Sequence, residues 1–161
     1  MVDPKDFWHA LGERPVGVTL VTARGAAGPA GFLGLSATHV SGNPPSLMVS
    51  IDNKTSALRV VLETQQFAVS CVPAEAAGLI NVFGGKTDLK GAERFDEDNW
   101  TSLTTGAPVL KRAPAAFDCV VEKTLAYAGS TIVVGRVVDL RITQGDTITY
   151  LRGRFSAGGE S

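Results

Sequence analysis

The residues best suited to chemistry lie in one stretch from Gly31 to Ser56, which reads GFLGLSATHVSGNPPSLMVSIDNKTS. Near its start the side chains are small, so the backbone is open to close approach by another molecule. A flat ring can lie against such a backbone and accept hydrogen bonds from its N–H groups. We therefore expect four consecutive residues to contact an aromatic ligand: Gly34, Leu35, Ser36 and Ala37.

The same stretch ends in a junction between a strand and a helix. We expect Ser56 to be the N-cap of a helix over about residues 57–64, whose free N–H groups and positive dipole end favour a phosphate. The Lys54 ammonium adds positive charge beside them. Asp52 and Asn53 are further candidates, although such side chains also form turns. The stretch predicts a site for a phosphorylated, aromatic cofactor, with an ordinary hairpin, turn and capped helix as the alternative.

The elements that position these residues are mainly strands. Apolar, alternating or β-branched runs predict strands over residues 17–23, 32–40, 46–52, 67–72, 115–126, 131–142 and 147–151. Short helices are expected over 57–64 and 74–83. Several strands linked by short turns, with few brief helices, predict an antiparallel barrel. Asp3 followed by Pro4 predicts a further helix to about Leu11 that packs on this barrel or on a partner subunit.

A glycine-rich, charged segment follows the expected helix over 74–83. It reads GGKTDLKGAERFDEDNW and contains Phe95 and Trp100 as isolated aromatic residues. Such a segment is typical of a mobile flap anchored at two points, and an ordinary surface excursion is the alternative. Gly84, at its start, and Phe83, just before it, are candidates to border the aromatic ligand; the alternative for Phe83 is a core residue of its helix.

Composition limits the classes of partner. The 161 residues fit a single domain over 1–161, and the net charge is −1, with 15 basic and 16 acidic residues interspersed. There is no basic field for nucleic acid and no polybasic membrane anchor. The sequence has no long apolar run, and its first residues have no signal-peptide pattern, so we expect a cytoplasmic protein.

Several kinds of site are excluded by their missing motifs. The sequence contains no GxGxxG, Walker or GxSxG pattern, so a dinucleotide-binding fold and a serine hydrolase are not indicated. Cys71 and Cys119 lie in apolar runs without CxxC spacing, and the two histidines are His9 and His39. We interpret the cysteines as buried thiols and expect neither a disulfide nor a metal site.

The order of these motifs resembles the flavin reductase-like family, small NAD(P)H:flavin oxidoreductases that commonly supply reduced flavin to two-component monooxygenases. The similarity covers about Phe7–Phe155. In chain order its segments are PVGVTLVTA, GFLGLSATHVSGNPPSLMVSID, NKTS, NVFGG, ERF with Trp100, GAPVL, FDCVVE, IVVGRV and YLRGRF. The resemblance implies a mainly β split barrel of Greek-key type and a homodimer with flavin near the subunit interface.

The resemblance also implies roles for single residues. FMN or FAD would be the cofactor, Lys54 and Ser56 its phosphate ligands, and NAD(P)H the co-substrate. Arg154 would lie near an anionic nucleotide group. Three positions depart from the family pattern: Leu33 replaces a threonine, Ala57 replaces a hydroxyl residue, and residues 128–130 read Ala-Gly-Ser in place of Gly-Asp-His. Ser130 is then the residue expected beside the nicotinamide.

The function implied is an NAD(P)H-dependent flavin reductase that passes reduced flavin to a separate oxygenase. Because Ser130 stands where many members have a histidine, a flavin-binding electron carrier or storage protein without nicotinamide turnover is an alternative. A flavin-dependent reductase of another acceptor, such as a corrinoid, is a second alternative.

Overall fold

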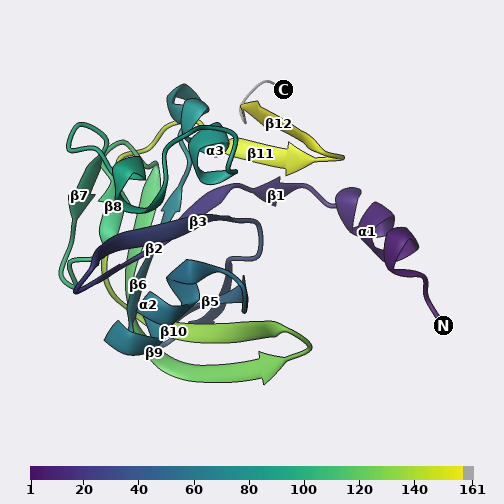
Figure 1. Ribbon diagram of the computed structural model, residues 1–161, viewed down its shortest axis with the longest axis horizontal. Coiled ribbons are helices and arrows are strands. Elements are labelled where there is room, and N and C mark those ends of the chain that lie inside the picture. Colours follow the sequence, from purple (N-terminus) through teal and green to yellow (C-terminus); the bar gives the residue numbers. More distant parts are fainter. Residues whose placement is uncertain (158–161) are drawn as a thin grey trace.

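Strands are the main secondary structure of the computed structural model, which describes residues 1–157 (Figure 1). The predicted single domain over 1–161 therefore includes four residues outside the described ones. The helices are α1 (Pro4–Gly12), α2 (Ser56–Thr64) and α3 (Gly78–Phe83), with short 3-10 turns η1 (Ala74–Ala76) and η2 (Gly91–Arg94). The strands are β1 (Val16–Gly17), β2 (Thr19–Gly25), β3 (Gly28–Gly34), β4 (Thr38–Gly42), β5 (Pro45–Asp52), β6 (Gln66–Cys71), β7 (Trp100–Ser102), β8 (Pro108–Leu110), β9 (Ala115–Tyr127), β10 (Ser130–Ile142), β11 (Ile148–Leu151) and β12 (Arg154–Ala157).

Seven strands form one antiparallel sheet in the order β3-β2-β6-β9-β10-β5-β4. Its two edge strands, β3 and β4, are consecutive in sequence and are joined by Leu35–Ala37 alone. Four Cα–Cα steps from Gly34 to Thr38 span at most about 14 Å. The sheet must therefore curl until its two edges lie close together. Within residues 1–157, no strand pairing joins β3 to β4, so the curled sheet stays open between them. We call this gap, which Leu35–Ala37 crosses, the seam.

The expected single strand over residues 32–40 is wrong, because it is interrupted at the seam. The Ser36 hydroxyl donates to the Ser50 carbonyl oxygen (3.1 Å) and accepts from the Ser50 N–H (3.2 Å). A side chain thus takes over the hydrogen bonds that a backbone neighbour would give to β5. Because a side chain replaces the backbone as hydrogen-bond partner here, strand pairing is interrupted after β3. The chain then crosses to the opposite edge of the sheet before β4 begins.

Close packing around Phe67 fixes the centre of the sheet. Phe67 is fully buried on β6, and Gly135 lies on β10 at a register shift in the pairing with β9. A Cβ atom at Gly135 would lie 2.5 Å from the Phe67 ring and 2.9 Å from the Cys119 Cβ. A glycine is required there because no side chain fits between the phenylalanine and the neighbouring strand.

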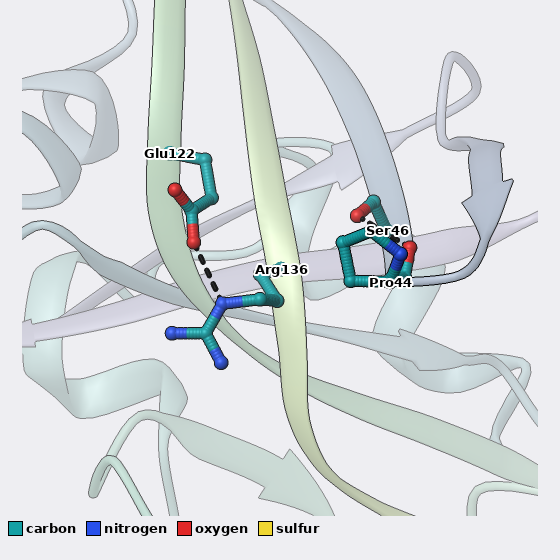
Figure 2. Close-up of polar contacts among 4 residues, drawn as sticks. All are labelled: Pro44, Ser46, Glu122 and Arg136. Atoms are coloured by element: carbon teal, nitrogen blue, oxygen red, sulfur yellow. Dashed lines mark hydrogen bonds and ion pairs between the residues drawn. The ribbon is translucent and has the colours of Figure 1, made fainter.

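Two polar contacts lie on the surface of this sheet, one between β9 and β10 and one at the start of β5 (Figure 2). Arg136 on β10 and Glu122 on β9 form an ion pair with Nε 2.6 Å from Oε1, and both side chains are about half exposed. Ser46 donates to the Pro44 carbonyl oxygen at 3.0 Å where β5 begins. An exposed pair of this kind stabilises the fold by at most about 1 kcal/mol, so the buried packing decides the sheet geometry.

Helix α1 begins as predicted and packs differently. Asp3 caps it by accepting from the Lys5 N–H at 2.7 Å. None of its residues is buried, and in Figure 1 it stands at the side of the molecule beyond β1. It does not pack on the barrel, because it meets the rest of the chain mainly through its last turn. The alternative, packing on a partner subunit, stays a prediction. None of the helices within residues 1–157 is long and apolar enough to cross a membrane.

The remaining expected elements are present with shifted ends. The helix expected over residues 74–83 is divided into η1 and α3. Its first turn is a 3-10 turn in which the Ala76 N–H donates to the Pro73 carbonyl oxygen at 2.9 Å. The two long strands expected over 115–126 and 131–142 each match to within one residue. The buried residues of both strands lie in their first halves, and pairing between the two strands continues through the more exposed remainder.

Candidate functional site

A cleft of about 700 Å³ opens at the seam between β3 and β4. One side, which we call the sheet wall, consists of residues from the sheet and its turns: Gly34, Leu35, Ser36, Ser50, Asp52, Thr55 and Ser130. The opposite side, the helix wall, consists of Trp8, Leu11 and Arg14 from α1 and the loop after it. Phe32, Leu33, Phe83 and Gly84 complete the lining.

The seam leaves backbone groups free to bind a ligand. Within residues 1–157, no backbone hydrogen bond is made by Leu35, Ser36 or Ala37. Leu35 and Ser36 line the cleft and also a second hollow of about 440 Å³, which Ala37 and Arg14 line as well. Because buried or half-buried N–H and C=O groups need partners, this short segment is suited to a ligand with both donors and acceptors.

Gly34 is required by the core and not only by a ligand. A Cβ atom there would lie 2.9 Å from Val21 Cγ2 and 3.1 Å from Thr19 Oγ1. The Thr19 hydroxyl also donates to the Gly34 carbonyl oxygen at 2.8 Å. The glycine thus lines the cleft as predicted, and its missing side chain makes room for the underlying strand.

The turn after β5 is held by its own side chains. The Lys54 N–H donates to Asp52 Oδ1 at 2.8 Å, and the Asn53 N–H donates to the Gly129 carbonyl oxygen at 3.0 Å. The Thr131 hydroxyl donates to Asn53 Oδ1 at 2.8 Å. Asp52 and Asn53 therefore fix this turn against the end of the β9–β10 hairpin, and only Asp52 also lines the cleft.

Thr55, and not Ser56, is the N-cap of α2. Thr55 has extended backbone angles, its carbonyl oxygen accepts from the Leu58 N–H at 3.1 Å, and Ser56 is the first helical residue. Both residues can cap a helix, so sequence alone does not fix the boundary. The Thr55 side chain makes no cap hydrogen bond. The first N–H groups of α2 are thus left for an outside partner, close to Lys54.

Ser130 faces the cleft from the end of the β9–β10 hairpin. It pairs with Asp52 on β5 and with Tyr127 across the turn. The two turn residues, Ala128 and Gly129, both have positive φ, at 46° and 87°. A two-residue hairpin of this kind favours Gly, Asn or Asp at both positions, so Ala128 is strained.

Aromatic residues anchor the segment over residues 84–100 beside the cleft. The Phe95 ring centroid lies 5.3 Å from that of Phe83 and 4.7 Å from that of Trp100, which confirms the two expected anchors. The Arg94 guanidinium stacks over Phe83 at 5.0 Å from the ring centroid, and burial lowers the Arg94 pKa below its ordinary value. Whether the segment moves as a flap stays a prediction.

Seven of the predicted residues line the cleft: Gly34, Leu35, Ser36, Asp52, Phe83, Gly84 and Ser130. Asn53, Lys54 and Ser56 line an adjoining hollow along α2, and Ala37 lines only the second hollow at the seam. Arg154 lines a separate hollow of about 420 Å³ with Leu151 and Arg152, so its nucleotide role stays a prediction. The sequence reasoning did not single out Leu11 or Arg14, and it assigned Trp8 to packing or a subunit contact. The available signal was an arginine followed by a proline directly before the first strand, at Arg14 and Pro15.

The cysteines are free thiols. Cys119 is fully buried and Cys71 is partly exposed. Burial raises the pKa of Cys71, and burial together with the nearby Asp118 charge raises the pKa of Cys119 to about 12. Neither thiol is poised for reaction at neutral pH.

Comparison with known proteins decides the family. The model of the flavin reductase-like domain matches residues 11–159. The chain belongs to the flavin reductase-like family. A relative from Agrobacterium fabrum, named FMN reductase (NADH) RutF, is 37% identical over 153 residues, which are 93% of this chain and 86% of the relative.

Solved structures of flavin reductases share the fold. The flavin reductase component of a bacterial two-component tryptophan halogenase superposes with a TM-score of 0.90 at 25% identity, covering 99% of this chain and 100% of the other. An NADH:FAD oxidoreductase from Streptomyces globisporus, in complex with NAD and FAD fragments, superposes with a TM-score of 0.84 at 27% identity, covering 97% and 94%. The predicted mainly β, split-barrel class is confirmed, with the split at Leu35–Ala37.

Proposed function

We propose that this member of the flavin reductase-like family is an NADH-dependent flavin reductase, which transfers a hydride from the nicotinamide to FMN or FAD. The observation that carries the proposal is the seam, where Leu35–Ala37 makes no backbone hydrogen bond and where Leu35 and Ser36 line the cleft. The cation-bearing turn at Lys54 begins near the same cleft. The Agrobacterium relative is named for this reaction with FMN.

The residues present fit a flavin. Cavities that take cofactors commonly measure about 300–1,000 Å³, and the cleft measures about 700 Å³. The N–H and C=O groups of Leu35–Ala37 match a ring system that carries donors and acceptors along one edge. The free N–H groups at the start of α2, with the Lys54 ammonium and the Ser56 hydroxyl, suit a phosphate.

The chain itself chiefly binds and orients. A bound flavin would supply the atom that accepts the hydride, and holding two reactants in register can lower the barrier by about 7–11 kcal/mol in favourable cases. The seam would hold the ring, Phe83 would shield the cleft from water, and Arg14 would attract an anionic nucleotide across from the sheet wall. None of these roles requires an acid or a base on the protein.

Ser130 is the residue that we place beside the nicotinamide. It lines the cleft where many family members have a histidine, and it offers a hydroxyl with no positive charge. We expect Ser130→His to change the KM for NADH by a few-fold, because one added hydrogen bond is worth about 0.5–1.5 kcal/mol, while the flavin Kd changes less. Steady-state kinetics and a flavin titration, with Ser130→Ala as the matched control, measure both. An unchanged KM in Ser130→His contradicts this placement.

The function is tested by NADH oxidation in air, followed by the loss of nicotinamide absorbance, with and without added FMN and FAD. Saturable turnover that depends on flavin supports the reductase. Parallel assays with NADPH show which nucleotide is preferred. Absence of turnover in a protein that still binds flavin overturns the reductase.

A flavin carrier or storage protein is the second candidate. The observation that favours it is Ser130, which provides no imidazole at the cleft. Such a protein would bind flavin at the same seam and would show no nicotinamide oxidation. The turnover assay above therefore decides between the two functions.

We further propose that the protein works in the cytoplasm as a homodimer and passes reduced flavin to a separate oxygenase. The halogenase reductase supports the last point, because it is itself one component of a two-component system. Exposed apolar residues support a subunit contact: Phe7 and Trp8 on α1 are 52% and 67% exposed, and Leu125 and Tyr127 on β9 are 60% and 76% exposed. Light scattering of the purified protein measures the mass; a monomer contradicts the dimer.

A further inference from the structure

A hollow of about 560 Å³ runs along α2 and adjoins the cleft at Thr55. Thr55 lines both spaces, so a ligand that leaves the cleft past this residue enters the second hollow directly. The other residues that line it come from the turn before α2 and from one side of the helix: Asn53, Lys54, Ser56, Leu58, Arg59, Leu62 and Glu63. The hollow is large enough for a nucleotide.

The lining combines an apolar surface with two cations. Leu58 is buried at the base, while Leu62 is 41% exposed. Arg59 and Leu62 are three positions apart on α2 and are therefore neighbours on the helix surface. Lys54 has no ionic partner within residues 1–157. A flat apolar ring next to negative groups is complementary to this arrangement.

The ion pair beside the hollow is weak. Arg59 Nε lies 4.0 Å from Glu63 Oε1, at the limit for such a contact, and the two side chains are 77% and 61% exposed. The guanidinium can turn toward a phosphate without losing a strong partner. Glu63 remains as an acceptor for hydroxyl or amino groups of a bound nucleotide.

We propose that this hollow binds the adenosine monophosphate half of FAD, with the chain of the dinucleotide crossing from the cleft at Thr55. The adenine would lie on Leu62, and Arg59 and Lys54 would neutralise the diphosphate. The inference rests on the proposed function, because it requires that the flavin ring binds in the cleft. It specifies that the protein holds FAD through contacts that FMN does not make.

The test compares two ligands on one pair of substitutions. Arg59→Ala combined with Leu62→Ser changes exposed side chains on α2, so we expect the fold to be retained. Fluorescence titration should show FAD affinity reduced about tenfold, because a charged hydrogen bond and an adenine contact are lost together, while FMN affinity stays within about twofold. The matched control is Arg136→Ala, which removes another exposed, paired arginine and should change neither affinity.

Each outcome has one meaning. Equal losses for FMN and FAD, or no loss for either, overturn the inference, as does a wild-type protein that binds FMN but not FAD. A wild-type protein that binds neither flavin overturns the inference and the proposed function together. A protein that binds both flavins without oxidising NADH loses the reductase function alone, and the ratio of the two affinities still decides this inference.

Discussion

The two walls of the cleft are held by very different amounts of structure. The sheet wall is fixed by strand pairing between β5 and β10, by the Ser36–Ser50 hydrogen bonds and by Asn53, which binds both Gly129 and Thr131. The helix wall comes from α1, none of whose residues is buried. The end of α1 is held where the Arg152 N–H donates to the Gly12 carbonyl oxygen, and Arg152 also pairs with Glu13 at 2.7 Å.

This difference separates two kinds of ligand contact. A group that must keep one orientation is best held by atoms that cannot move, and the sheet wall supplies them. A group that enters and leaves in each turnover is better served by a wall with few buried contacts. The comparison therefore predicts that substitutions in the sheet wall and its turn change flavin binding, with the exception of Ser130 beside the nicotinamide. Substitutions in the helix wall should instead change the use of NADH.

The strongest way to break the comparison is to remove the phosphate site. Lys54→Ala combined with Ser56→Ala should weaken FMN binding by about 10- to 100-fold, because charged hydrogen bonds are worth about 1.5–3 kcal/mol. Riboflavin, which has no phosphate, should bind within about twofold of its original affinity. Fluorescence titration of both ligands measures this. Equal losses for riboflavin and FMN would place the phosphate elsewhere.

Trp8→Ala tests the helix wall. The side chain is 67% exposed and lines the cleft, so its loss should raise the KM for NADH by about three- to tenfold, and the free energy of unfolding should change by less than about 0.5 kcal/mol. Ile142→Ala is the matched control, because Ile142 is a 68% exposed apolar residue at the end of β10 that does not line the cleft. A large change in flavin Kd with an unchanged KM would reverse the roles of the two walls.

Ser36→Ala tests the seam itself. The substitution removes two hydrogen bonds to Ser50 and should lower the free energy of unfolding by about 1 kcal/mol. Flavin affinity should fall by about two- to fivefold, since Leu35–Ala37 loses its tether. Urea denaturation and a flavin titration measure the two effects. Ser41→Ala, on β4, removes only the hydrogen bond from the Asn43 N–H and should leave flavin affinity unchanged.

The smallest expected effect lies at the hairpin that carries Ser130. Ala128→Gly should raise the free energy of unfolding by about 0.5 kcal/mol, because relief of an unfavourable positive φ exceeds the added entropy of a glycine. Thermal denaturation measures the change. Ala126→Gly, within the adjacent strand β9, should instead destabilise the protein.

The strands that a local pattern encodes were predictable. The apolar and β-branched runs of β9 and β10 predict two long strands, although only the first half of each contains buried residues. The interruption after β3 was not predictable, because it depends on a hydrogen bond from Ser36 to a residue 14 positions later. Pairing over such a distance leaves no trace in the local pattern.

The residues of the candidate site also fall into those that local sequence predicts and those that it does not. The place of Gly34, Leu35 and Ser36 in the cleft was predictable because a run of small residues marks an open backbone, and the turn at Lys54 because a strand-to-helix junction has a recognisable sequence. Trp8 and Arg14 were not, because α1 reaches the cleft only through its attachment to Arg152, far along the chain. The boundary at Thr55 was misplaced by one residue because Thr55 and Ser56 have similar capping ability.

The position of the seam also sets the order in which the protein can be assembled. The strands on its two sides, β3 and β4, are connected through strand pairing only by way of β2, β6, β9, β10 and β5. The site therefore needs residues as late as Ile142 in place. Contacts between such distant segments form slowly. A nascent chain therefore has no flavin site until nearly all of it has been synthesised. Flavin, by binding only the finished sheet, would shift the equilibrium toward the folded protein and report that folding is complete.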